Sequence, residues 1–271
     1  MNHFMIKKSS RSSILFAIAV SLLLIHCSDS STSVDPGNDN ENGTNPDPDP
    51  PIEFDHSRAP GASAEAFITS STFDQLTIEI QYMPGARPDD SSINNLQNFL
   101  ELHLEKTSVA ILEPQEIESG EQESYTADDI RTIEEENREE FTDESTLAAY
   151  VLFLDGEFES GSVLGVAYFN TSTAYFGDTI NRISGGLGQP SRTTIESTVF
   201  AHEFGHLMGL VNNGTEALGD HHDSENGAHC TVEECLMYFQ VETTNFFANL
   251  FDGSIPELDN FCLADIDAVK E

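Results

Sequence analysis

Residues 193–209 read TTIESTVFAHEFGHLMG. Within this stretch two apolar residues and two histidines recur at intervals of three or four positions, the spacing that places side chains on one face of an α-helix. These four residues are Ile195, Val199, His202 and His206. The pattern predicts a helix with two imidazoles one turn apart on the face that it turns toward the core.

The limits of this helix can also be inferred from its residues. Thr193 is followed three positions later by Glu196, which is the spacing of a capping box at a helix N-terminus. Gly209 can adopt a positive φ angle, which ends a helix and lets the chain turn back. We therefore expect the helix to begin near residue 193 and to end near residue 209.

The pair of histidines brackets a glutamate in the order H-E-x-x-H, from His202 through Glu203 to His206. Two imidazoles one turn apart can bind a single Zn²⁺ ion. A glutamate beside the first histidine is placed to take a proton from a metal-activated water. We expect a zinc site with Glu203 as general base. The alternative is a coincidental pair of surface histidines, or a purely structural metal site.

With Gly209 the motif extends to H-E-x-x-H-x-x-G, and here the sequence resembles the metzincin zinc metallopeptidases. The pattern of that clan continues to a third histidine ligand three residues later, where this chain has Asn212, a poor zinc ligand. Either the site is degenerate, or the third ligand comes from further along the chain. The candidates are Asp220, His221, His222 and His229.

A second motif favours one of these candidates. Residues 229–237 read HCTVEECLM, which resembles the archaemetzincin signature of a third histidine followed by Cys, four residues, Cys, an aliphatic residue and Met. This resemblance implies that His229 is the third zinc ligand, with His222 as the second choice. It also implies that residues 212–228 form an inserted loop and that Met237 is the Met-turn residue beneath the metal.

Three further cysteines belong to the same region: Cys230, Cys235 and Cys262. The resemblance implies a second zinc held by four cysteines, but the fourth position here is Asp265. In an oxidising compartment a disulfide among the three is at least as favourable as a second metal site, and we expect the disulfide. The ligand-rich loop at residues 219–226 is expected to be a solvated acidic loop.

The N-terminus has the composition of an export signal. Three basic residues within positions 7–11 precede an apolar run at residues 14–25, which is too short to span a bilayer. Residues 1–26 are therefore expected to be a signal peptide. Cys27 follows directly and resembles the acylated cysteine of a bacterial lipobox.

The stretch after Cys27 is rich in Ser, Asp, Asn, Gly and Pro and cannot form a core. Residues 27–55 are expected to be a disordered tether, and residues 56–271 the metallopeptidase domain. The expected location is the bacterial cell envelope, as an outer-membrane lipoprotein or at the cell surface. Contact with the membrane would be through the lipid on Cys27 alone.

Strand and helix patterns alternate along this domain, which predicts a mixed α/β (α+β, metzincin-like) fold. A twisted sheet with packed helices leads to the active-site helix and an irregular C-terminal subdomain that contains the Met-turn. The resemblance implies that the strand just before the helix edges the substrate cleft. Strands are expected at residues 76–83, 109–117, 147–154, 163–169 and 174–180, and helices at residues 89–106, from 126 onward and near 256.

The chain is strongly acidic, with 48 Asp and Glu residues against 11 Lys and Arg and a net charge of −37. This charge argues against nucleic acid as a partner. The motifs favour a zinc-dependent endopeptidase acting on peptide or protein substrates. The alternative is a catalytically inactive, zinc-containing surface binding protein, and a cation-scavenging lipoprotein ranks last.

Overall fold

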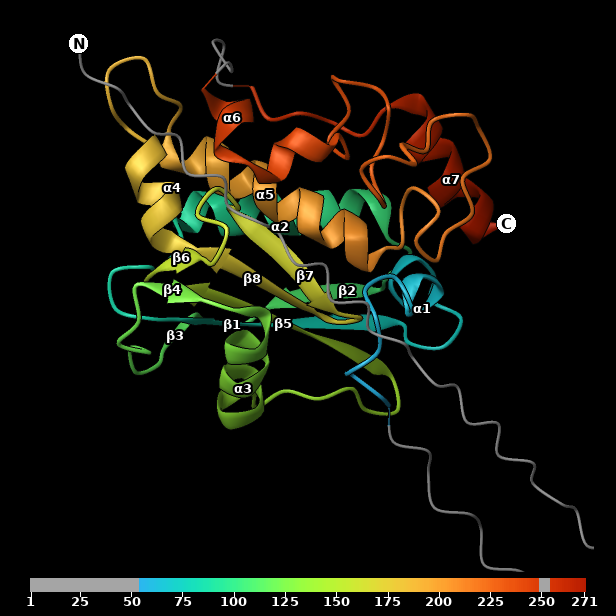
Figure 1. Cartoon of the computed structure of the whole chain (residues 1–271). Helices are drawn as coiled ribbons and strands as arrows, with labels where there is room; N and C mark the ends of the chain where they lie inside the picture. The colour runs from blue at the N-terminus through green and yellow to red at the C-terminus, as the bar shows by residue number, and fades with distance from the viewer. Residues whose placement is uncertain (1–53, 249–253) are drawn as a thin grey trace, which may run out of the picture. The chain divides into compact units, whose positions relative to one another are not determined.

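The computed structural model describes residues 54–248 and 254–271 of the chain (Figure 1). The expected signal peptide (1–26), the expected lipidation at Cys27 and all but the last two residues of the expected tether (27–55) lie outside the described residues. They therefore stay predictions. In the part that the structure describes, no helix is both long and apolar enough to cross a bilayer.

A sheet of six strands forms the middle of the fold, in the order β2-β1-β5-β8-β7, and β3 pairs with a further part of β1 (Figure 1). The described neighbours run parallel except β7 and β8, which form an antiparallel hairpin. The strands are β1 (Gln75–Tyr82), β2 (Ser108–Ile111), β3 (Gln115–Glu116), β5 (Thr146–Leu154), β7 (Gly165–Phe169) and β8 (Ser172–Phe176), with a separate pair β4 (Ser124–Tyr125) and β6 (Glu157–Phe158).

The two clearest strand patterns are confirmed as the centre of this sheet. The alternating residues 76–83 form β1, and the apolar run at residues 147–154 forms β5, which is buried along almost its whole length. The single strand expected over residues 109–117 is instead split into β2 and β3. Pro114 lies between them, and it has no N–H to donate to a strand ladder.

Residues 174–180 do not form the expected single strand. β8 ends at Phe176, and α4 (Gly177–Ile183) begins at the next residue. A Cβ atom on Gly177 would be 2.8 Å from the Cβ of Ala86, so the helix starts where only glycine fits. β8 is also not an edge strand, because β5 and β7 pair with its two sides. The expectation that residues 174–180 edge a cleft is therefore wrong, and β7 is the edge strand at this end of the sheet.

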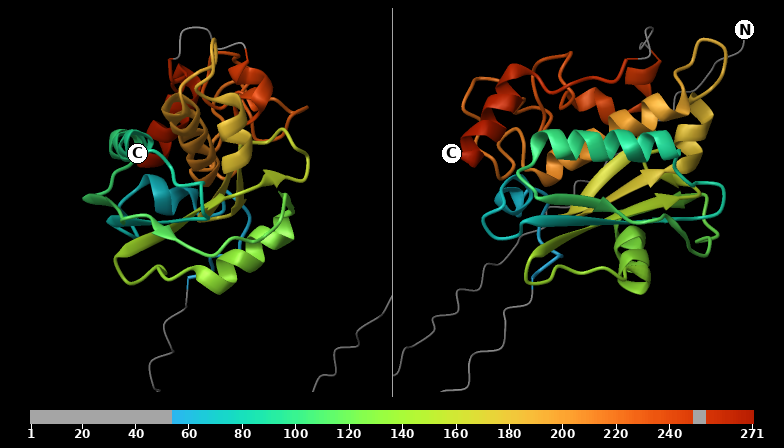
Figure 2. Two further views of the ribbon diagram at one scale, coloured as in Figure 1. Left: turned by 90° about the vertical axis from the view of Figure 1, so that its left-hand side faces the viewer. Right: turned by 180° about the vertical axis from the view of Figure 1, so that it is seen from behind.

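Helices cover both faces of the sheet (Figure 2). α2 and α5 lie side by side on one face, and α3 lies on the other. α3 begins after Thr126, as expected, and Thr126 and Asp129 form a capping box at its start. The helices of this part are α1 (Ala64–Ile68), α2 (Asp90–His103), α3 (Ala127–Asn137), α4 and α5 (Arg192–Leu207).

Glu196 joins α5 to α2 and does not cap its own helix. The cap is Ser191, whose Oγ accepts a backbone N–H of the first turn at 3.0 Å. The buried Glu196 carboxylate accepts hydrogen bonds from the Asp89 N–H at 2.8 Å and from the Ser92 hydroxyl at 2.7 Å. The expected capping box of Thr193 and Glu196 is therefore wrong, because the glutamate is buried against α2 and bonded there.

Beyond α5 the chain is largely irregular, as the sequence predicts. Gly209 has a φ of +69°, and a Cβ there would be 2.7 Å from the Cβ of Ala64, so glycine permits both the turn and the close approach. The elements that follow are η1 (Phe239–Glu242), α6 (Thr244–Phe247) and α7 (Asn260–Lys270). The mixed α/β fold with an irregular C-terminal part is thus confirmed.

Candidate metal centre

The two histidines of α5 point toward each other from successive turns. Their Nε2 atoms are 3.2 Å apart, and the His202 ring is fully buried. The Nδ1 atom of His202 lies 2.7 Å from the carbonyl oxygen of Leu236, to which it donates a hydrogen bond. This bond leaves Nε2 without a proton and directed at the neighbouring imidazole, as a metal ligand requires.

His229 joins this pair from the loop that follows α5. Its ring centroid is 5.3 Å from that of His202 and 5.0 Å from that of His206. Its Nδ1 atom lies 2.7 Å from the carbonyl oxygen of Asn226, while its Nε2 atom is buried with no hydrogen-bond partner. Sequence reasoning singled out these three histidines, and the structure brings them together.

The other candidates for the third position lie elsewhere. His222 is exposed and its Nε2 atom lies 2.9 Å from the carbonyl oxygen of Gly227. Asn212 is exposed at the turn after α5, with a φ of +63°. Asp220 is exposed as well, and His221 belongs to a second cluster. The geometry therefore favours His229 over each of them.

The three imidazoles are also neutral, which is the charge state that a metal ligand needs. Burial, followed by the neighbouring imidazoles, lowers the pKa of His202 to about 3 and that of His206 well below its ordinary value. Burial also lowers the pKa of His229. Neutral imidazole is the form that binds a metal. An unpartnered, buried Nε2 atom beside two further neutral rings fits a zinc ion in its donor set.

Glu203 is buried on the same helix, and neither of its carboxylate oxygens has a hydrogen-bond partner. Burial, followed by the nearby carboxylate of Glu242, raises its pKa well above the ordinary value. A buried carboxyl group with both oxygens unpaired lowers the stability of the folded protein. Such groups are found mainly at functional sites, where that loss of stability is tolerated.

Glu242, at the end of η1, is a residue that sequence reasoning missed. Its Oε2 atom is 3.9 Å from the Nε2 atom of His202 and 3.9 Å from that of His229. The ligand atoms of Glu242 and the three histidines all lie within 4.8 Å of one another. Burial raises the pKa of its carboxyl to about 7. The only signal in the sequence was an acidic residue five positions after Met237.

Met237 packs directly under the motif helix. Its sulfur atom occupies the space that a Cβ atom on Gly205 would need, between the two histidines of the helix. The Met237 side chain is fully buried. It therefore packs against the motif helix at the position between the two histidines, and a glycine at 205 is what allows it to lie so close. Its role as the Met-turn residue stays a prediction.

The three cysteines form a second buried cluster. All three are free thiols, and the Sγ atoms of Cys235 and Cys262 are 3.7 Å apart, so the expected disulfide is not formed. The Nδ1 atom of His221 lies 3.4 Å from the Sγ atom of Cys230 and 3.8 Å from that of Cys262. Ligand atoms of His221, Cys230, Asp259 and Cys262 lie within 4.8 Å of one another.

Asp265 does not take the fourth cysteine's place among the thiols. One of its carboxylate oxygens accepts a hydrogen bond from the Leu218 N–H at 2.9 Å, and the other lies 2.9 Å from the Nε2 atom of His221. It therefore orients the imidazole whose other nitrogen faces the thiols. An imidazole held by a carboxylate in this way is a frequent arrangement behind a metal ligand.

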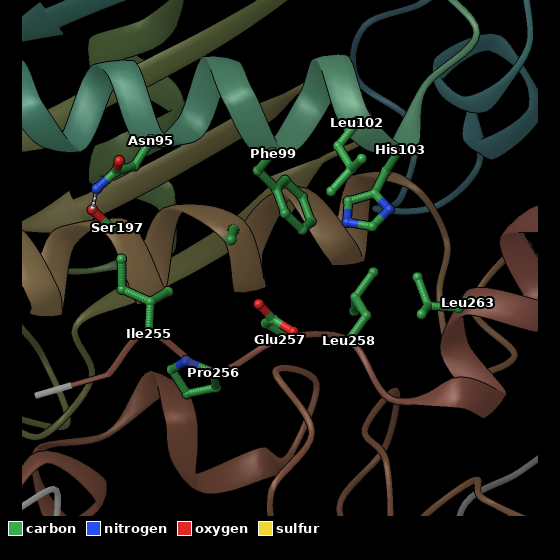
Figure 3. Close-up of a pocket in the computed structure, with 11 residues that line it drawn as sticks. Asn95, Phe99, Leu102, His103, Ser197, Ile255, Pro256, Glu257, Leu258 and Leu263 are labelled. Atoms are coloured by element: carbon green, nitrogen blue, oxygen red, sulfur yellow. Dashed lines mark hydrogen bonds between the residues drawn. The ribbon is translucent and has the colours of Figure 1, made fainter. Parts of the chain in front are cut away.

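A separate recess lies between α2, α5 and residues 255–258 (Figure 3). Its volume is about 340 Å³, and its lining is largely apolar, with Phe99 and Leu102 of α2 opposite Leu258. None of the residues that line it is a candidate metal ligand. The recess is therefore distinct from the chemistry described above.

Fold and centre together define a mixed α/β protein with three histidines and two glutamates gathered at an H-E-x-x-H helix. No family model matches the chain, and no curated protein matches it. Among solved structures it is similar to an archaemetzincin from Methanopyrus kandleri, with 14% identity and a TM-score of 0.47 over 73% of this chain and 96% of that one.

It is also similar to metalloproteinase-II from Bacteroides fragilis, with 13% identity and a TM-score of 0.42. That match covers 82% of this chain and 59% of the other, so this chain spans under two thirds of that protein's length. Both likenesses are distant.

Proposed function

We propose that this protein is a zinc-dependent endopeptidase of the metzincin type, acting on peptide or protein substrates. The observation that carries the proposal is the convergence of unpaired buried groups. The Nε2 atom of His229 has no hydrogen-bond partner, and its ring lies next to the rings of His202 and His206. The Glu203 carboxylate also has no hydrogen-bond partner, and it lies near the same centre.

In this proposal His202, His206 and His229 hold Zn²⁺ through their Nε2 atoms. Zinc, when bound, lowers the pKa of a water molecule and polarises the scissile carbonyl group. Glu203 accepts the proton of the attacking water and later delivers it to the leaving amine. Its burial supports this role, because a carboxylate of raised pKa is a stronger base than one in water.

The test is a Glu203→Gln variant, which keeps the size of the side chain but removes the base. Zinc content should stay unchanged, while cleavage of casein should fall by about 10²–10⁴-fold. Glu225→Gln is the matched control, because it removes one acidic charge from an exposed position in the same C-terminal part. Full activity in Glu203→Gln would rule out the mechanism.

A second candidate function is a catalytically inactive, zinc-containing surface binding protein. It is favoured by Glu242, which gives the centre a fourth protein ligand within reach, as in closed structural zinc sites. Zinc content and casein cleavage, measured on the same sample, separate the two functions. One zinc per chain at this centre with no cleavage under any condition would favour the binding protein.

The thiol cluster supports a further zinc ion with a structural role. Three buried free thiols lie together, two of them face His221, and the sequence predicts an export signal. Unprotected thiols tend to oxidise outside the cytosol, whereas thiolates that bind a metal are held in place. The ligand atoms that converge in this proposed site are those of His221, Cys230, Cys262 and Asp259. The Sγ atom of Cys235 lies 3.7 Å from that of Cys262 and is the alternative to Asp259 as the fourth ligand.

The location proposed for the enzyme is the bacterial cell envelope, with the lipid on Cys27 as its membrane contact. The support for this location is the N-terminal sequence alone. The net charge of −37 bears on partners instead, because it disfavours nucleic acid. Labelled fatty acid should be incorporated by the full chain and not by a Cys27→Ser variant. Equal labelling of both would exclude the anchor.

A further inference from the structure

Glu242 offers the metal centre a fourth ligand that the motif does not contain. In a tetrahedral zinc site with bonds of ~2.0–2.1 Å, neighbouring ligand atoms lie ~3.3–3.4 Å apart. The Nε2 atoms of His202 and His206 are 3.2 Å apart, and the Glu242 oxygen is 3.9 Å from two of the three histidine nitrogens. All four ligand atoms lie within 4.8 Å of one another. Shifts of about 1 Å or less in the side chains would bring them to such a geometry.

Backbone hydrogen bonds on either side of residue 243 fix the main chain that carries this carboxylate. The Leu164 N–H donates to the carbonyl oxygen of Glu242 at 2.9 Å, and the Thr244 N–H donates to that of Ser162 at 3.1 Å. Val163 and Thr243 form the antiparallel bridge between these two bonds. The segment leading into β7 therefore fixes the backbone of residue 242, and only side-chain rotation can move the carboxylate away.

The surroundings favour a cation between Glu242 and the histidines. The Oε2 atom of this carboxylate lies 3.9 Å from the Nε2 atoms of His202 and His229, which are neutral imidazoles and do not balance its charge. The charge of this carboxylate also acts on the buried Glu203, whose pKa it helps to raise, so the two acids repel each other when both are ionised. Two carboxylates in a largely buried space are costly together, and a divalent ion offsets that cost. The Glu242 side chain is 28% exposed, so it can rotate toward solvent.

We propose that Glu242 is an internal ligand, which fills the fourth coordination position of the metal in the resting protein and keeps water from that position until its side chain rotates out. This inference rests on the metal site proposed above. It adds a resting state in which the centre is closed, and it makes hydrolysis dependent on an opening step within the chain itself.

The test uses the full chain loaded with Co²⁺, whose visible absorption reports the ligands of the metal directly. Azide is the probe, because it binds a metal only where a coordination position is open. The variants are Glu242→Asp, which keeps the charge but is one methylene too short, and Glu242→Gln, which keeps the length but is a poor ligand. Glu225→Gln controls for loss of one acidic charge, and His206→Ala identifies the bands of this centre.

If Glu242 is the fourth ligand and the open form is about a tenth of the molecules, azide binds both Glu242 variants about tenfold more tightly than the wild type. The cobalt spectra of the variants should also differ from that of the wild type before azide is added. Circular dichroism checks that each variant is folded, and either variant alone suffices for the comparison.

Two outcomes would contradict the proposal, and they can be told apart. If cobalt binds but azide titrates wild type and both variants with equal affinity, Glu242 is not a ligand, and the proposed peptidase function is unaffected. If the wild type shows no cobalt band that His206→Ala removes, the metal site itself is refuted, and the function falls together with the inference.

Discussion

Gly165 of the edge strand β7 lies directly against Glu203 of α5. A Cβ atom on residue 165 would be 3.0 Å from the Cγ atom of Glu203 and 2.6 Å from a methyl carbon of Val199. The missing side chain lets the edge strand approach the helix at the position of the proposed general base. The strand therefore forms one wall of the space around the Glu203 carboxylate.

Replacement of Gly165 by Ala should damage both stability and activity, because the new methyl group forces strand and helix apart. We expect the free energy of unfolding to fall by about 1–3 kcal/mol. A displacement of Glu203 by about 1 Å should lower casein cleavage by up to ~10²-fold. Urea unfolding and casein cleavage measure the two effects.

The control for that substitution is Gly186→Ala, in an exposed loop where the neighbouring atoms belong to the flexible side chain of Gln189. It should change neither measurement appreciably. If Gly165→Ala behaves like this control, the close approach of β7 does not position the base.

His229 and His222 offer a matched pair for the third ligand, since both lie on the loop after α5. His229→Ala should remove zinc from the H-E-x-x-H centre and abolish cleavage, because two imidazoles alone hold zinc weakly. His222→Ala should leave zinc and cleavage unchanged, because its ring faces solvent. Zinc content by mass spectrometry decides the point, and the reverse result would transfer the role to His222.

The thiol cluster predicts a second, separable zinc ion. The wild type should carry two zinc ions per chain, and His221→Ala should lose one of them while casein cleavage by the remaining centre persists. The loss of a structural metal should also lower the melting temperature markedly. A His221→Ala variant with unchanged zinc content and melting temperature would show that the cluster binds no metal.

His56 predicts that stability decreases in mild acid. Its ring contacts the Arg138 guanidinium, with Nδ1 3.0 Å from Nη2, and burial followed by that charge lowers the pKa to about 4. In the unfolded chain the ordinary value is 6.5. Between these pH values His56 is protonated in the unfolded chain but stays neutral in the folded protein. The stability present above pH 6.5 is therefore lost as the pH falls toward 4.

Allowing for solvent screening of a half-buried ring, this loss is about 1 kcal/mol between neutral pH and pH 5. His56→Asn removes the titrating group, so its stability should fall less over that range than that of the wild type. Urea unfolding at the two pH values gives the difference. An equal fall in both proteins would mean that His56 is protonated in the folded state.

Local patterns in the sequence predicted the parts of the centre that depend on local geometry. The spacing of His202 and His206 places them on one helix face wherever that helix packs, and Gly209 ends the helix in any context. β5 was predicted for a similar reason, because an apolar run of that length is buried in almost every fold. His229 was found through the spacing of its neighbours, by resemblance to a known signature.

The errors and omissions arise where a residue acts through partners distant in sequence. Glu196 matched a capping box, but it is buried against α2 and bonds there. A disulfide among the three cysteines was predicted from the expected oxidising compartment, but His221 from the preceding loop faces two of the thiols. Glu242 has no motif at all, since its place depends on pairing with residues 162–164.

The sequence by itself therefore determined the motif helix, its two histidines, the adjacent glutamate and the turn after them, because helical periodicity and glycine conformation are local properties. The resemblance in the sequence favoured His229 among the loop histidines, and the tertiary structure places it beside the other two. Only the tertiary structure decided which strand lies against Glu203 and which acid comes within reach of the three histidines. Those contacts join segments far apart along the chain, and their distances depend on how the sheet, α5 and the C-terminal segment pack together.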